Sequence, residues 1–338
     1  MLPYKRTEDE KDENRFEARL LTEEDYKAFL PVYNDFQTRA IEEYKFELEP
    51  LDFNGFIEAV EKNLINCVVL FESGIAVAFL VYTTAISEAV ELNIIHSFKM
   101  ENVQERANYL LKKFLELTRA ERNDKVVCYP MLGSQKNLVG DIAKYGFKFV
   151  GLAVLRFFMS GTNSREILKM AELSELSDEY KLVEWDEKYF QDAVYVVQEA
   201  FETSADALFD PRFKSVEGTD DIITKIVKDL YAEFLPEATT VILYNDEPIG
   251  FCFMNLTGGT IANIPIFAIK KDFQGKGLSK HMLKKSVEKL IELSDSGEKQ
   301  IIEVNTTTET NNFQALKMYR HLGFKEDYNY PQSYLPVR

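Results

Sequence analysis

The sequence is short of the residue types from which metal sites and disulfide frameworks are built. It has three cysteines, which lie far apart without a Cys-x-x-Cys pair, and three histidines without partners at metal-ligand spacing. Zinc and redox motifs need such pairs close together in the sequence. We therefore expect no metal site, and the lack of a disulfide framework predicts a reducing, cytoplasmic location.

Long hydrophobic runs and a surplus of basic residues are also missing. The longest apolar run, residues 75–82, is too short to span a bilayer and is typical of a buried strand. The first residues show no signal-peptide pattern. The formal net charge of −16 argues against nucleic-acid binding, which needs many Lys and Arg. We therefore expect neither a membrane nor a nucleic-acid partner. The negative charge either maintains solubility or favours a cationic substrate such as an amine.

What the sequence does contain is two halves with the same plan. Each half has a strand, a strand–turn–strand pair, a further strand and an amphipathic helix, in that order. Corresponding positions, such as Leu111 and Leu283 or Gly146 and Gly323, keep a nearly constant separation along the chain. An internal duplication explains this regularity. Two unrelated α/β modules are the alternative.

The pattern predicts α/β architecture in two domains, with 46% hydrophobic residues to fill two cores. We place the first domain at 1–160 and the second at 179–338, joined by a polar, acidic linker at 161–178. Within the second domain, residues 259–271 are predicted to form one strand, and an amphipathic helix is predicted to follow it.

Two glycines, Gly275 and Gly277, lie between that predicted strand and helix. Glycine lets the backbone approach a bulky group closely, and a helix start offers unpaired N–H groups. Together these features suit a phosphate. Lys276 either adds positive charge to this site or is an ordinary solvated lysine. A Gly-x-Gly pair also occurs in many turns, so the pair alone does not decide.

Two motifs carry a resemblance to the GNAT family of acyl-CoA N-acyltransferases. Residues 274–279 read Gln-Gly-Lys-Gly-Leu-Ser, similar to the family's Gln/Arg-x-x-Gly-x-Gly/Ala after its fourth strand. The family's later motif, Asn-x-x-Ala-x-x-x-Tyr-x-x-x-Gly-Phe, is matched at the right spacing by Asn312, Ala315, Tyr319, Gly323 and Phe324. Ser279 stands where the family has Gly or Ala. The resemblance covers about residues 180–338 and extends to 16–160 only through the internal repetition.

The resemblance implies two tandem GNAT-like domains, each a twisted mixed sheet flanked by helices, with acetyl-CoA as the acyl donor. The backbone of the predicted strand would pair with the pantetheine arm as a peptide adds to a sheet edge, although a purely structural strand is the alternative. The first half lacks the glycines, and its Glu101 and Glu105 would repel a pyrophosphate, so we expect one donor site per chain. The expected donor-binding residues are Phe267, Ala268, Ile269, Gln274, Gly275, Lys276, Gly277, Leu278, Ser279, Asn312 and Tyr319.

Two residues are candidates for catalysis. Tyr319 matches the family position whose hydroxyl gives a proton to the departing thiolate, although a tyrosine on an inward helical face is often core. Glu303, a charged residue between apolar neighbours in residues 300–305, is the candidate general base. A glutamate satisfied by a local hydrogen bond is one alternative. Deprotonation through water without a dedicated base is another.

We therefore expect direct transfer of the acetyl group of acetyl-CoA to a primary amine, on a small molecule or a peptide N-terminus. A non-catalytic acyl-CoA-binding or assembly protein, or an acyltransferase for another acyl group, are the alternatives. In the family the acceptor is covered by the region between the first two helices, here residues 199–213. Its Glu202, Asp206 and Asp210 either attract a cation or belong to a solvated loop. The sequence makes no prediction about the oligomeric state.

Overall fold

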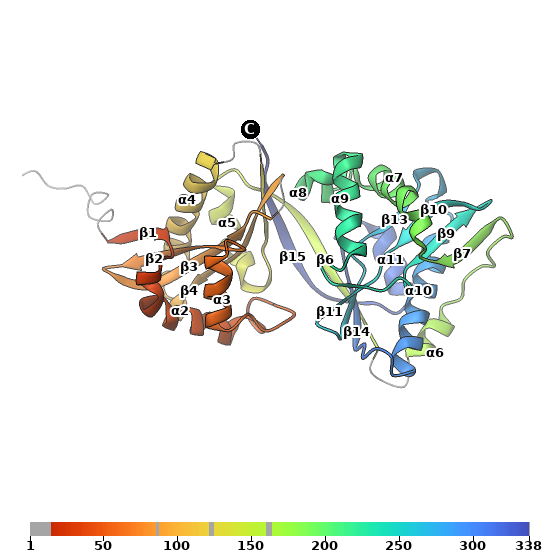
Figure 1. Ribbon diagram of the computed structural model, residues 1–338, viewed down its shortest axis with the longest axis horizontal. Coiled ribbons are helices and arrows are strands. Elements are labelled where there is room, and N and C mark those ends of the chain that lie inside the picture. The colour runs from red at the N-terminus through yellow and green to blue at the C-terminus, as the bar shows by residue number, and fades with distance from the viewer. Residues whose placement is uncertain (1–14, 86–87, 122–124, 160–163, 338) are drawn as a thin grey trace, which may run out of the picture. The chain divides into compact units, whose positions relative to one another are not determined.

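The chain forms two compact units in the computed structural model (Figure 1). The structure describes residues 15–85, 88–121, 125–159 and 164–337. The first unit comprises Met1–Val150 and Tyr330–Arg338, and the second comprises Gly151–Asn329. The units therefore differ in extent from the domains expected from the sequence, because residues 151–160 fall in the second unit and 330–338 in the first.

Each unit completes its sheet with a strand from the other half of the sequence. In the second unit, β6 (Lys148–Phe158) pairs antiparallel with β14 (Glu303–Glu309). In the first unit, the end of β15 (Lys325–Leu335) pairs antiparallel with β5 (Val126–Pro130). Sequence periodicity does not reveal this exchange, because a strand alternates in the same way whichever strand lies beside it.

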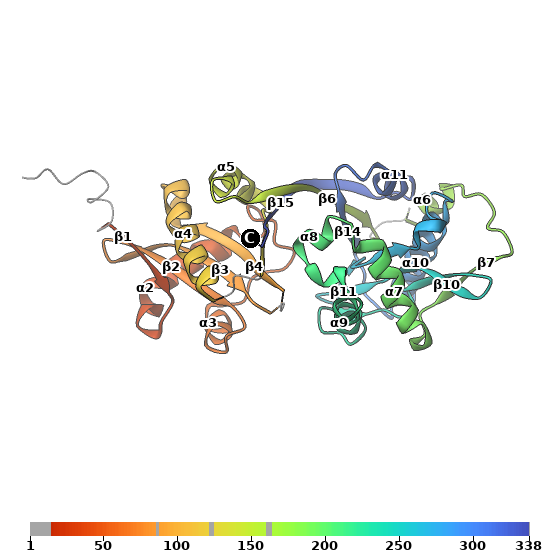
Figure 2. The ribbon, with the colours of Figure 1, turned by 90° about the horizontal axis from the view of Figure 1, so that it is seen from above.

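In the first unit, a mixed sheet has helices on both faces. Figure 2 shows α4 and α5 on one side of this sheet and α2 and α3 on the other, and each side buries its own apolar cluster. The strand order is β1-β2-β3-β4-β5-β15. The further strands are β1 (Phe16–Leu20), β2 (Asn66–Glu72), β3 (Ile75–Thr83) and β4 (Ala89–Ser97). The helices are α2 (Tyr26–Arg39), α3 (Phe53–Glu61), α4 (Val103–Glu121) and α5 (Val139–Ala143), with short 3-10 turns η1 (Glu23–Asp25), η2 (Phe98–Met100) and η3 (Gly133–Leu138).

A glutamine side chain covers a strand edge inside the first unit. β4 runs parallel to β5 only through the Ala89–Glu91 segment, so the rest of that edge of β4 has no strand beside it. Gln135, which is 4% exposed, accepts a hydrogen bond from the Ile95 N–H at 3.1 Å and donates one to the Ile95 carbonyl at 3.0 Å. The Tyr129 hydroxyl donates to the same side-chain oxygen. The amide of Gln135 thus replaces a neighbouring strand residue, as buried backbone groups require.

The second unit has two sheets, with the strand orders β13-β10-β9-β7 and β6-β14-β12-β11-β8. Its further strands are β7 (Tyr180–Glu184), β8 (Glu233–Phe234), β9 (Thr240–Tyr244), β10 (Glu247–Cys252), β11 (Asn255–Thr257), β12 (Ile261–Asn263) and β13 (Phe267–Ile269). The helices are α6 (Ser164–Met170), α7 (Phe190–Phe201), α8 (Asp206–Phe209), α9 (Val216–Val227), α10 (Leu278–Asp295) and α11 (Phe313–His321). The 3-10 turns are η4 (Glu187–Tyr189), η5 (Pro211–Lys214) and η6 (Lys271–Phe273).

The segment expected to form one strand at 259–271 is divided in two. β12 pairs parallel with β14, and β13 pairs antiparallel with β10. Between them lies Pro265, which has no N–H to give to a ladder. β12 stays with β14, and Asn263 and Asn305 are the last paired residues of these two strands. Because β13 follows β10 instead, β13 and β14 separate beyond this point.

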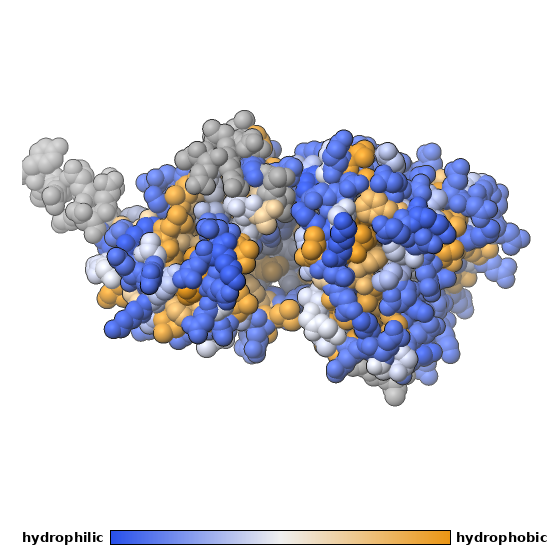
Figure 3. Space-filling model, viewed as in Figure 1, coloured by the Kyte–Doolittle hydropathy of each residue, from blue (hydrophilic) through white to orange (hydrophobic). Residues whose placement is uncertain are grey.

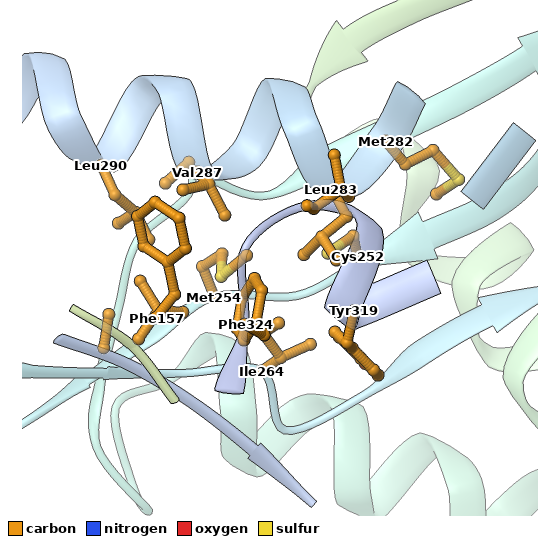
Figure 4. Close-up of a cluster of buried hydrophobic side chains, with 14 of the residues drawn as sticks. Phe157, Cys252, Met254, Ile264, Met282, Leu283, Val287, Leu290, Tyr319 and Phe324 are labelled. Atoms are coloured by element: carbon orange, nitrogen blue, oxygen red, sulfur yellow. The ribbon is translucent and has the colours of Figure 1, made fainter. Parts of the chain in front are cut away.

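The strands of the second unit carry an apolar cluster on each face. One cluster, shown in part in Figure 4, lies under α6, α10 and α11, and the other lies under α7, α8 and α9. Neighbouring residues of one strand divide between them, as Phe251 and Cys252 do. Leu168 of α6 and Ala171 are buried in the first cluster, so the described part of the expected linker packs on this unit; residues 161–163 lie outside the described residues.

No helix within the described ranges is long and apolar enough to cross a membrane. Hydrophilic side chains make up most of the face seen in Figure 3, where hydrophobic residues form smaller groups between them.

Replacing Gln135 with leucine should destabilise the first unit. The substitution keeps a buried side chain of similar size but leaves the Ile95 N–H and carbonyl without partners, at a cost of roughly 2–4 kcal/mol. Denaturant unfolding should show the loss, and hydrogen exchange should speed up in the peptide that contains Ile95. Gln104→Leu, on an exposed position of α4, is the control. Equal stability of the two variants would contradict the structural role of Gln135.

Removing β6 should prevent the second unit from folding. A fragment of residues 179–338 lacks the strand that pairs with β14 along its whole length, whereas a fragment of residues 148–338 retains it. We expect the shorter fragment to aggregate because β14 then exposes an unpaired edge. Light scattering and circular dichroism of the two fragments test this. A monodisperse, folded shorter fragment would show that β6 is dispensable.

Candidate active site

The loop before α10 presents a row of unused backbone donors. Gly275 and Gly277 have φ of 75° and 80°, a conformation that favours glycine, and nothing lies within 4 Å of a Cβ placed on either. Among the described residues, no acceptor reaches the N–H groups of residues 275–279. They stand at the start of an 18-residue helix, whose dipole adds positive potential. The loop can therefore hold an anion such as a pyrophosphate.

The same loop is anchored to β13 and bordered by basic side chains. The Gln274 amide donates to the Ile269 carbonyl at 3.0 Å. Lys276 Nζ lies 4.7 Å from the centroid of the Phe273 ring, so this lysine covers an aromatic side chain as well as carrying charge. The pKa of His281 is lowered, first by burial and then by the charges of Lys284 and Lys280. A local excess of positive charge thus surrounds the first turns of α10 in an otherwise acidic protein.

One edge of β13 is open. The Phe253 N–H donates to the Ile266 carbonyl at 3.0 Å and the Lys270 N–H to the Ile249 carbonyl at 2.9 Å. Antiparallel alternation therefore turns the N–H and C=O of Phe267 and Ile269 away from β10. Apart from the bond of the Ile269 carbonyl to Gln274, these groups have no partner within the described ranges. Ala268, in contrast, faces β10 and its backbone is not available to a ligand.

Tyr319 lies where β14 leaves β12. It is 4% exposed, its ring packs edge-on against Phe324 at 5.3 Å, and its hydroxyl lies 3.3 Å from the Thr306 Oγ1 atom. Figure 4 shows it on α11, near Cys252 and Ile264. Burial is the main cause that raises the pKa of its phenol, so the hydroxyl stays protonated at neutral pH.

Asn312 has a structural task in α11. Its side-chain oxygen accepts the Ala315 N–H at 3.1 Å and so caps the helix that carries Tyr319. The residue itself is exposed. Its side-chain amide is thus the group left to contact a ligand.

Glu303 lies on the other face of β14 from Tyr319. Val304 and Thr306 point toward α10 and α11, so strand alternation turns Glu303 toward the α7–α9 side. Glu303 is 6% exposed, and a carboxylate oxygen of Glu303 accepts from Arg156 Nη1 at 2.6 Å. Thr306 lies three positions further along the strand, a distance of about 10 Å. Glu303 is therefore an ion-paired carboxylate, and a proton would reach it from the Tyr319 side only through an intermediary such as water.

A row of polar side chains, which the sequence analysis missed, crosses the sheet on the Glu303 face. Asn255, Asn263, Asn305 and Arg156 are successive register partners on β11, β12, β14 and β6. Asn255 is 3% exposed, and its side-chain oxygen has no partner among the described residues. We call these four residues the polar row. Three asparagines in strands were the sequence signal for this row, but only the strand register shows that they lie side by side.

The acidic residues of the region 199–213 differ in their surroundings. Glu202 pairs with Lys271 at 3.2 Å, and Asp210 binds the buried Arg212 through both carboxylate oxygens. Asp206 has no basic partner among the described side chains, and desolvation, followed by the nearby carboxylates of Glu309 and Asp210, raises its pKa. Of the three, Asp206 is thus the one whose charge is not neutralised by a neighbour.

The first unit fills the corresponding positions with its own side chains. Ile95 lies on the strand that corresponds to β13, and its backbone is covered by Gln135. The first turn of α4, which follows that strand, holds Arg106, which is 5% exposed and donates to the Ser97 hydroxyl at 3.1 Å and to the Phe98 carbonyl at 3.0 Å. The sequence pointed to repulsion by glutamates here. The structure adds that the strand edge is covered and that a guanidinium is folded inward.

No group of His, Cys, Asp and Glu suited to a metal ion occurs in the described parts of the chain.

Comparison with known proteins points to the part of the chain that holds β13, the loop before α10 and Tyr319. Residues 236–326 match the family model of an acetyltransferase (GNAT) domain. No curated protein matches the sequence.

Several solved structures share the fold. A GCN5-related N-acetyltransferase from Sphaerobacter thermophilus is 14% identical, with a TM-score of 0.65 over 96% of each chain. A tandem GNAT protein from the clavulanic acid biosynthesis pathway is 12% identical, with a TM-score of 0.58 over 96% of this chain and 99% of that one. A glucosamine N-acetyltransferase region in a fungal multi-domain β-N-acetylglucosaminidase is 11% identical, with a TM-score of 0.62 over 95% of this chain and 38% of that one. Residues 236–326 therefore match a GNAT acetyltransferase domain, and the fold is similar to that of tandem GNAT proteins over almost the whole length of the chain.

Proposed function

We propose that the second unit transfers the acetyl group of acetyl-CoA directly to a primary amine. The observation that carries this proposal is that two sets of unpaired backbone groups lie next to each other, one on β13 and one before α10. The unused N–H groups of residues 275–279 suit the pyrophosphate, and the open edge of β13 suits the amides of the pantetheine arm. Both lie on one short stretch of chain, joined by the bond from Gln274 to Ile269.

The two faces of β14 support a division of labour in the reaction. The amine attacks the thioester carbonyl after it loses a proton, and the C–S bond breaks with its electron pair going to sulfur. On the α11 side, the protonated Tyr319 hydroxyl is the donor for that thiolate. On the opposite side, the Glu303 carboxylate and the side-chain oxygens of the asparagines in the polar row offer acceptors to the incoming ammonium, with a water carrying the proton onward. Positioning of the two reactants supplies much of the acceleration.

The uncompensated charge of Asp206 also favours a cationic acceptor over an anionic one. The three cysteines are buried and form no disulfide, which supports a cytoplasmic location.

A non-catalytic acyl-CoA-binding role is the second candidate. The ion pair between Glu303 and Arg156 favours it, because the guanidinium occupies the carboxylate that would otherwise contact the amine. Thioester consumption separates the two functions. We expect acetyl-CoA to be consumed with at least one member of a panel of small primary amines and short peptides. Binding of acetyl-CoA without turnover across the panel would favour the second candidate.

Replacing Gly277 with glutamate should abolish acetyl-CoA binding. The side chain is strained at positive φ, covers the unused N–H groups and repels phosphate. Calorimetry should give one site per wild-type chain and none for the variant. Gly74→Glu is a matched control, because Gly74 has φ of 83° and equally open surroundings in the first unit. Two equivalent sites, or unchanged affinity in Gly277→Glu, would refute the assignment.

Replacing Tyr319 with phenylalanine should leave acetyl-CoA affinity intact and slow turnover by about ten- to a thousandfold, since a general acid contributes on the order of 10²-fold or more. Stopped and continuous thiol-release assays measure this. Tyr33→Phe is the control, because it also removes a hydroxyl from a buried tyrosine, one that donates to the Leu51 carbonyl at 2.8 Å. A Tyr319→Phe rate within twofold of wild type would make Tyr319 a core residue only.

A further inference from the structure

Two buried hydroxyl groups share a single hydrogen bond beside the open edge of the second unit. Thr306 Oγ1 and Tyr319 Oη lie 3.3 Å apart, and the residues are 7% and 4% exposed. Within the described ranges, neither hydroxyl has another hydrogen-bond partner. Each hydroxyl carries one proton, and one hydrogen bond uses only one of the two. One O–H proton is therefore left over in a place that water scarcely reaches.

The position of Thr306 determines where the unused O–H proton can point. Asn305 is the last residue of β14 that pairs with β12, and Thr306 is the next residue along the strand. It follows that the hydroxyl pair lies where β13 and β14 begin to separate. The Tyr319 ring is held by Phe324 and by the buried cluster under α10 and α11, so only the O–H bond can rotate. The hydrogen bond to Thr306 sets the direction in which the Tyr319 O–H bond points.

We propose that Thr306 is the positioning residue of the general acid: its hydroxyl donates to Tyr319 Oη, turns the phenolic proton toward the open edge and stabilises the phenolate formed when that proton leaves. This inference rests on the proposed function of Tyr319. The opposite arrangement, with Tyr319 donating to Thr306, would hold the phenolic proton away from a ligand. It would also fail after proton transfer, because a phenolate can only accept.

The chemistry balances with these two residues. When the tetrahedral intermediate collapses, the C–S bond breaks and its electron pair goes to sulfur. The Tyr319 proton moves to that sulfur to give the thiol, and the phenolate accepts the Thr306 proton in a hydrogen bond without taking it. The proton that the amine lost replenishes Tyr319 through solvent. Burial raises the pKa of this phenol, while the bond from Thr306 lowers it, so the threonine offsets part of the cost of forming the anion.

Thr306→Val tests the inference, because valine keeps the shape and the strand preference of threonine and removes only the hydroxyl. We expect kcat to fall about three- to tenfold, in line with the loss of one ordinary hydrogen bond, with the KM for acetyl-CoA unchanged. Thr306→Ser should restore kcat to within about twofold of wild type. Thr118→Val is the control, since Thr118 is also buried and its hydroxyl also makes a single bond, to the Phe114 carbonyl in the first unit.

A double variant separates a positioning role from a structural one. If Thr306 acts through Tyr319, adding Thr306→Val to Tyr319→Phe should cause no further loss of kcat. Independent, multiplying effects of the two substitutions, or a Thr306→Val enzyme with wild-type kcat, would overturn the inference while leaving the proposed function intact. Wild-type turnover in Tyr319→Phe itself would instead remove the general acid, and the inference with it. Melting temperatures of all variants identify any loss that comes from unfolding.

Discussion

The separation of β13 from β14 is the constraint on which the rest of the second unit depends. Pro265 lies between β12 and β13 and has no N–H to give to a ladder. As a result, β12 stays paired with β14 and β13 pairs with β10. Backbone groups at the resulting edge then lack a strand partner, which a folded protein tolerates only where another partner can reach them. The loop that follows β13 leads directly to the start of α10, so the open edge and the anion-binding loop are consecutive in the chain.

The same separation decides which residues work together. Beyond Asn305, β6 is the one described strand that still accompanies β14. Around this point β14 presents Thr306 to one face, and Glu303 and Asn305 to the other. A phenol held in an apolar cluster therefore faces one side of the opening, and an ion-paired carboxylate with amides faces the opposite side. An acyl transfer needs one group that accepts a proton from the amine and another that donates a proton to the thiolate, and the two faces of β14 offer one of each.

The first unit shows how the same fold is stabilised without a ligand. Its β4 and β5 also separate, yet Gln135 covers the edge of β4 and Arg106, at the start of α4, is turned inward. Gln135 satisfies backbone groups of the kind that the second unit leaves open at β13, and Arg106 donates to the Ser97 hydroxyl and the Phe98 carbonyl. The comparison illustrates that a fold carries a site only where its side chains leave room for one.

The sequence by itself determined the elements and the local motifs, because these depend on periodicity and on residues close together in the chain. Apolar runs predicted the strands on either side of the Ser73–Gly74 turn. The spacing of Gly275, Gly277 and Tyr319 indicated the family whose model matches residues 236–326. Only the tertiary structure decided the rest. The exchange of β6 and β15, the division of the strand at Pro265, the ion pair of Glu303 with Arg156 and the cover of Ile95 by Gln135 all join residues far apart in sequence. No local pattern encodes such pairs, since they arise from strand register and from which neighbour each strand finds.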